Sequence, residues 1–222
     1  MHSALALLSL LPLTSAHFLL SWPPARGFDE STAPNFPCGG FDTVLSNRTT
    51  WPATGGPIQL DMHHTQTVIE VLIALGSDPG VNYNIVMRPT FLQQGPNDFC
   101  IGMVSVPSSV NITEGMPATI QVVSNGDDAG SGGLYQCADV TLTMTPLSSS
   151  DYSSHCANST GITTQSISDP SVNANETSPT AAGSASASGT AAAATSKALA
   201  PQNTLAAWAI GAVGVVGGLM AL

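Results

Sequence analysis

Histidines stand at two places where they could hold a metal ion: His17, and the adjacent pair His63 and His64. Residues 1–16 have the features of a removable secretory leader, so cleavage would make His17 the first residue of the mature chain. A terminal histidine supplies an amine and an imidazole nitrogen, and a second histidine completes a T-shaped site of three nitrogens. Such tetragonal nitrogen donors suit Cu(II). The sequence therefore predicts a copper site.

The leader determines whether His17 can act in this way. Its apolar stretch, residues 4–13, is too short to span a bilayer, and small residues at Ser15 and Ala16 follow it. Only the terminal amine and His2 supply charge before the apolar stretch, which is weak for a leader. A cut at any other position would leave His17 without a free amine.

The histidine pair closes an alternating stretch, residues 58–62, whose apolar side chains share one face. His64 continues that face, whereas His63 continues the polar face with Asp61. The two rings are therefore not expected to coordinate the same metal ion. We favour His64 as the ligand because a buried imidazole needs a polar partner. On periodicity alone, a solvated strand end explains the pair equally well.

The elements that would position these residues are strands. β-branched or alternating stretches are separated by Gly, Pro, Asn or Asp clusters, which is typical of an antiparallel β-sandwich. A short turn of helix is conceivable within residues 31–43. The expected strands are 57–63, 67–75, 83–91, 99–106, 118–124 and 134–145.

Four cysteines suggest two disulfides in an oxidising compartment. None has the CxxC spacing of a zinc or redox site. Three pairings are possible and spacing does not choose among them; we favour Cys38 with Cys137 and Cys100 with Cys156.

The chain divides into four expected regions. After the leader, residues 17–158 are long enough for one core, and residues 159–196 form a Ser, Thr and Ala-rich stalk that is expected to be disordered. Residues 197–222 combine a polar spacer with an uncharged apolar tail, the signal for a glycosylphosphatidylinositol anchor attached within 183–196. A tail-anchoring helix is the alternative. Both place the protein on the outer face of the plasma membrane or in the cell wall.

The net charge of −10 excludes nucleic acid and anionic lipid headgroups as partners and leaves cations or neutral glycans. Glycosylation sequons, which fit a surface glycoprotein, begin at Asn47, Asn111, Asn158 and Asn175.

Asp139 falls within an expected strand, where carboxylates are disfavoured, so its position there requires an explanation. Its place on a polar outer face, shared with Thr141 and Thr143, is a sufficient explanation. Asp127 and Asp128 have the character of loop acids that favour solubility.

Six segments of the chain carry a recognisable combination of residues: 17–20, 23–24, 26–28, 38–41, 56–57 and 134–139. Together they resemble the fungal copper-binding proteins related to lytic polysaccharide monooxygenases, the copper-acquisition-factor group of anchored surface proteins. The resemblance implies an immunoglobulin-like sandwich and a monomer that binds one Cu(II) ion through the terminal His, an internal His and an Asp. Carried over by position, the terminal His is His17, the internal His is His64, with His63 as the alternative, and the Asp is Asp139.

A carboxylate ligand would favour Cu(II) over Cu(I), so we expect copper binding and homeostasis and no oxidative cleavage of polysaccharide. A transporter or reductase at the membrane is the candidate recipient of the copper. A copper monooxygenase acting on cell-wall glycan is the alternative, and a passive wall protein is the third hypothesis. Trp22 and Trp51 are the only tryptophans before the tail, and two residues do not make a broad aromatic platform for glycan. Hydrolase sequence motifs are absent.

Overall fold

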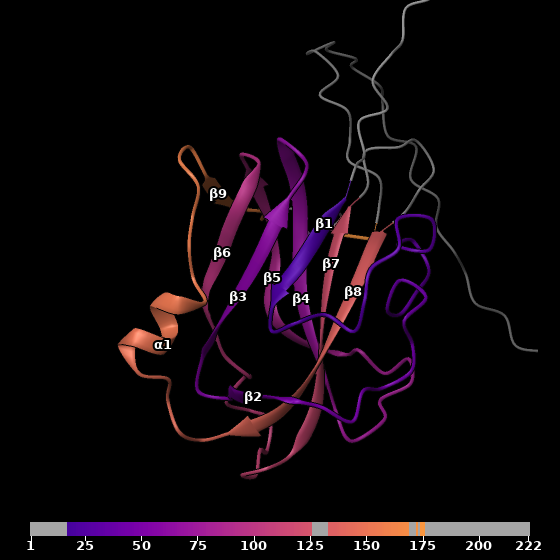
Figure 1. Cartoon of the computed structure of the whole chain (residues 1–222), viewed down its shortest axis with the longest axis vertical. Coiled ribbons are helices and arrows are strands. Elements are labelled where there is room, and N and C mark those ends of the chain that lie inside the picture. Colours follow the sequence, from indigo (N-terminus) through magenta and orange to yellow (C-terminus); the bar gives the residue numbers. More distant parts are fainter. Residues whose placement is uncertain (1–16, 126–132, 169–171, 173, 176–222) are drawn as a thin grey trace, which may run out of the picture. The chain divides into compact units, whose positions relative to one another are not determined.

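The computed structural model describes residues 17–125, 133–168, 172 and 174–175 as two β-sheets packed face to face (Figure 1). The smaller sheet has three antiparallel strands in the order β1-β3-β6. Their bounds are β1 (Phe18–Trp22), β3 (Gly56–Met62) and β6 (Asn97–Val104).

The larger sheet has six strands in the order β2-β8-β7-β4-β5-β9. Every neighbouring pair is antiparallel except β2 and β8, which run parallel. The all-β sandwich predicted from the strand pattern is confirmed. The bounds are β2 (Thr49–Pro52), β4 (Gln66–Leu75), β5 (Ile85–Gln94), β7 (Pro117–Asn125), β8 (Gly133–Thr143) and β9 (Thr163–Ser166).

The core lies between the two sheets because alternate side chains of each strand point inward. Phe18 of β1, Leu60 of β3 and Ile120 of β7 are all less than 2% exposed. Trp51 of β2 is fully buried. Phe91 and Phe99 meet across the sheets with ring centres 6.1 Å apart.

Six of the strands coincide with the expected ones, and three further strands have no periodic sequence signal. β1 and β2 are too short to show alternation, and all four residues of β9 are exposed. Residues 31–43 form turns and no helix, whereas α1 (Ser149–Ser154) is a short helix whose N-cap Ser148 accepts a hydrogen bond from the Asp151 N–H.

The position of β9 moves the end of the folded domain. β9 pairs with β5 over four residues, within the segment expected to begin a disordered stalk at residue 159. The boundary at residue 158 is therefore too early: an edge strand needs only backbone partners, so its composition need not be apolar. The leader, the rest of the stalk and the tail lie almost entirely outside the described residues, among which no helix is long and apolar enough to cross a membrane.

Two disulfides join Cys38 to Cys137 and Cys100 to Cys156, and no described cysteine is free. These are the pairs that the sequence analysis favours. The first ties the loop after β1 to β8, and the second ties β6 to the segment after α1.

Candidate metal centre

The start of β1 and the end of β3 bring His17 and His63 together. Phe18 pairs with Met62, so His17 lies opposite His63, whose backbone N–H donates to the His17 carbonyl at 3.0 Å. The two imidazole rings stack with centres 4.1 Å apart and planes at 27°. The ring centre of Phe28 lies 4.8 Å from that of His17.

His64 occupies the buried face that the alternation predicts, with 5% of its surface exposed. Buried polar side chains also lie on β4, β5 and β7. Gln93 lies opposite Thr67, both are fully buried, and the Thr67 and Ser124 hydroxyls are 2.8 Å apart. The backbone joins this region to the histidines, because Gly95 N–H donates to the carbonyl of Thr65, the residue after His64.

Acidic side chains flank the histidines at the surface. The His17 Nδ1 atom is 3.8 Å from Glu30 Oε1, and the His63 Nε2 atom is 3.5 Å from Asp61 Oδ2. Burial lowers the pKa of the His17 ring below 6.5, and charge on His63 and His64 lowers it further, against the opposite effect of the two carboxylates. Three imidazoles thus share one end of the sandwich, and the ring of His17 is held towards its neutral, metal-binding form.

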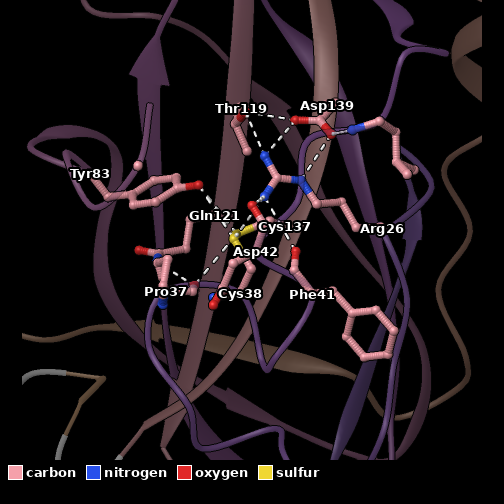
Figure 2. Close-up of a disulfide and its surroundings, with 12 residues drawn as sticks. Arg26, Pro37, Cys38, Phe41, Asp42, Tyr83, Thr119, Gln121, Cys137 and Asp139 are labelled. Carbon is pink, nitrogen blue, oxygen red and sulfur yellow. Dashed lines mark hydrogen bonds and ion pairs between the residues drawn. A yellow bond between two sulfur atoms is a disulfide. The ribbon is translucent and has the colours of Figure 1, made fainter. Parts of the chain in front are cut away.

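Asp139 lies in a different environment (Figure 2). The guanidinium of Arg26 donates to both of its oxygens, from Nε and Nη2, each at 2.8 Å. Thr119 Oγ1 and the Leu45 backbone N–H add bonds of 2.7 and 2.8 Å. The side chains of Arg26 and Asp139 are 3% and 1% exposed, so this is a buried ion pair with its hydrogen bonds satisfied.

Asp139 lies on β8, the strand of the larger sheet that contacts β1. Gln136 of β8 contacts β1, donating to the Phe18 carbonyl and accepting from the Leu20 N–H. β1 and β8 start at the same end of the sandwich (Figure 1), and Asp139 follows Gln136 by three residues along β8. The ligand role expected for Asp139 has no support in this geometry, because Arg26, Thr119 and Leu45 already engage its carboxylate.

The donor set that remains consists of imidazoles. Within the described part of the chain, no three His, Cys, Asp or Glu side chains gather as ligands of one ion. A site of one amine and two imidazoles needs only two such side chains, so the residues at this end of the sandwich fit a copper ion held by nitrogen. Asp127 and Asp128 lie outside the described residues.

Residues 15–161 match the BIM1-like copper acquisition factor domain. The chain belongs to the BIM1-like copper acquisition factor family. It is 44% identical to an uncharacterized protein of Aspergillus fumigatus over 184 residues, 81% of this chain and 74% of that protein. It is 35% identical to copper acquisition factor BIM1 of Cryptococcus neoformans var. grubii over 138 residues, 57% of this chain and 60% of that protein. A lytic polysaccharide monooxygenase-like protein, ham-7 of Neurospora crassa, is 30% identical over 72% of this chain and 79% of its own length.

Membership of the BIM1-like family confirms the resemblance drawn from the sequence segments and supports a copper-related function. Two residues received no role from the sequence: Glu30, beside His17 at the candidate site, and Arg26, the partner of Asp139. A signal for Arg26 was present, because a carboxylate that is buried within a strand requires a partner for its charge.

Proposed function

We propose that this protein binds one Cu(II) ion at the cell surface through the amine and ring of His17 and the ring of His64, and that it serves copper acquisition or homeostasis. The observation that carries the proposal is the gathering of His17, His63 and His64 at one end of the sandwich, from strands far apart in sequence. The family supports copper as the ion.

The stacking of His63 on His17 favours His64 as the second ligand. The lone pairs of imidazole nitrogens lie in the ring plane, so two nearly parallel rings direct them side by side and away from a common ion. The His63 side chain is also 37% exposed, with Asp61 as its partner. His64 is buried and close enough for its charge to lower the pKa of His17.

The acidic character of the chain suits a cation-handling protein outside the cell. Glu30 and Asp61 at the candidate site and a net charge of −10 overall attract copper ions. The proposal also includes cleavage of the leader before His17 and a glycosylphosphatidylinositol anchor. A membrane transporter or reductase is the proposed recipient of the copper. We propose that the protein is monomeric, since a single chain supplies all three nitrogens.

A copper monooxygenase acting on glycan is the second candidate, since several relatives carry the name lytic polysaccharide monooxygenase-like. Because Arg26 donates to Asp139, the choice between the two functions is not based here on a carboxylate ligand. What favours copper handling is that neither tryptophan in the described part of the chain is set out as a platform for glycan. Trp51 is fully buried, and Trp22 stacks on His155 with ring centres 3.6 Å apart. Release of oxidised cellulose, chitin or xylan fragments in the presence of a reductant would favour the monooxygenase.

The proposal is tested by mass analysis of the secreted chain combined with copper titration followed by electron paramagnetic resonance. We expect a chain starting at His17 that binds one Cu(II) with three nitrogen ligands. Acetylation of the terminal amine and His64→Ala should each abolish that spectrum. His155→Ala, which removes a histidine stacked on Trp22, is the matched control and should leave it unchanged. A different first residue, or an unaltered spectrum after acetylation, would refute the proposed site.

A further inference from the structure

A small pocket lies where the two sheets part along one side of the sandwich. There β6 is the edge strand of the smaller sheet, and β5 with β9 forms the edge of the larger sheet. The pocket has a volume of about 230 Å³. It is lined from both sheets and from the chain between them, with Phe91, Phe99 and Ile162 as its apolar side and Arg88, Asn158 and Thr164 as its polar side.

Residues 156–159, beside the pocket, are bonded to β6 by a disulfide and by hydrogen bonds. Cys156 forms a disulfide with Cys100, and the Cys100 backbone N–H donates to Asn158 Oδ1 at 2.9 Å. Ser159 N–H donates to the carbonyl of Asp98 at 2.8 Å. The Asn158 side chain therefore has a fixed amide orientation, and its oxygen is already used.

Asn158 is also the first residue of a glycosylation sequon that ends at Thr160. A glycan is attached to the amide nitrogen, and with Oδ1 held by Cys100 the nitrogen is the side of the amide left for modification. Asn158 is exposed and lines the pocket. We propose that an N-glycan on Asn158 places its first N-acetylglucosamine in this pocket and covers the open edge of the sandwich between β6 and β5.

The chemistry of the pocket matches a sugar ring. Its volume is below the range of about 300–1,000 Å³ that is usual for drug-sized ligands, and suits a single monosaccharide. Partly exposed Ile101 and Ile162 offer an apolar surface for the C–H face of a sugar, above the buried rings of Phe91 and Phe99. Arg88, whose guanidinium lies 5.1 Å from the Phe91 ring centre, can donate to the sugar oxygens. Thr163 and Thr164 at the rim add hydroxyl groups.

The sequon at Asn111 provides an internal comparison. Asn111 lines a much wider pocket, about 590 Å³, together with Val106, Ile112 and Met144. A single sugar would not fill it, so a glycan there should remain in solvent. Both glycans can be removed without touching the asparagines, by Thr160→Ala and Thr113→Ala.

The test uses the full chain secreted from a host that adds N-glycans, with site-resolved mass spectrometry to measure occupancy. Thr160→Ala keeps the hydrogen bond between Asn158 and Cys100, so its effect reports the sugar alone. We expect Thr160→Ala to increase amide hydrogen exchange in β5, β6 and β9 and to lower Tm by about 2–4 °C. Thr113→Ala should do neither. An unmodified Asn158, or equal exchange in the two variants, would overturn the proposal.

A second measurement separates a seated sugar from one that merely shields the surface. Enzymatic release of N-glycans from the folded protein should be several-fold slower at Asn158 than at Asn111. Arg88→Ala, which removes an exposed side chain from the rim, should speed release at Asn158 and leave Asn111 unchanged. Equal rates at the two sites in the unmodified sequence would refute a seated glycan. Both outcomes are independent of copper binding.

Discussion

The backbone N–H of His63 donates to the carbonyl oxygen of His17, and the ring of His63 lies over the ring of His17. This relationship follows from the antiparallel register of β1 and β3 and does not depend on a flexible loop. A shift of one residue in that register would turn both buried faces outward. The position of His17 against His63 is therefore set by strand pairing. His64 lies in a bend two residues after the end of β3 and is buried.

Copper affinity should fall in acid in two stages. The His17 ring has its pKa lowered below 6.5 by burial and by the neighbouring imidazoles, so it is already neutral at pH 7. The terminal amine, with an ordinary pKa of about 7.7–8.0, must still lose a proton to bind copper. Affinity should thus fall about tenfold per pH unit below about pH 8 and more steeply once the rings protonate. Competition titrations between pH 5 and pH 9 measure this, and a flat profile between pH 6.5 and pH 7.5 would contradict an amine ligand.

Protonation of His17 should also affect folding. Because its pKa is lower in the folded chain than in the unfolded chain, the unfolded chain takes up the proton more readily. The corresponding stability is present above about pH 6.5 and is lost as the pH falls through the folded-state pKa. Denaturant unfolding of the copper-free protein at several pH values measures this, with His17→Gln as the variant that should lose the dependence.

Replacing Asp139 with Asn should destabilise the fold and leave the copper spectrum unchanged. Arg26 would remain buried without its counter-charge, which costs about 3–5 kcal/mol in comparable pairs. Asp61→Asn, at a carboxylate 42% exposed, is the control and should change the free energy of unfolding by less than about 1 kcal/mol. Denaturant unfolding and the Cu(II) spectrum are the two measurements. Loss of copper binding by folded Asp139→Asn would restore the ligand role expected from the resemblance.

The ion pair of Arg26 and Asp139 should also make the stability of the fold sensitive to acid. Burial by itself raises the pKa of Asp139, but the hydrogen bonds from Arg26, Leu45 and Thr119 outweigh burial and lower it overall. The stability from the pair is therefore present above about pH 3.9 and is lost as the pH falls through the folded-state pKa.

Tyr83 should make the fold sensitive to alkali. Burial raises the pKa of its phenol to about 12, and its oxygen lies 3.4 Å from Cys38 Sγ in the Cys38–Cys137 disulfide. The folded chain therefore keeps a proton that the unfolded chain loses near pH 10, so stability declines as the pH rises above about 10. Absorbance titration of tyrosinate and unfolding at pH 9 and pH 11 test this. Tyr83→Phe should show a smaller loss between the two pH values, and an equal loss would contradict it.

The sequence was sufficient for the sandwich because strands such as β3 and β7 carry an alternating or β-branched pattern that survives without structural context. It was also sufficient to put His64 on the buried face, since that follows from the same alternation. It could not find β9, whose four exposed polar residues are ordered only by β5.

Asp139 shows a second limit of prediction from sequence. A carboxylate inside a strand indicates that a partner is present, but the sequence does not identify that partner. A metal ion and the guanidinium of Arg26, 113 positions earlier in the sequence, fit that role equally well. The tertiary fold brings Arg26 to Asp139, a pairing that the sequence alone does not indicate. The stacking of His63 on His17 likewise depends on strand register and not on sequence distance.

The extension of the domain past residue 158 can be tested by truncation. A chain ending at residue 168 retains β9 and Ile162, which packs partly buried against the core and beside Gly95. A chain ending at residue 158 loses both and exposes the edge of β5. We expect the shorter chain to be less stable by about 1–3 kcal/mol, the sum of a few edge hydrogen bonds and one partly buried side chain less the entropy of ordering them. Hydrogen exchange should rise in β5 and not in β8, which lies on the far side of β7 and β4 in the same sheet. Equal stability of the two chains would show that the folded unit ends at residue 158 after all.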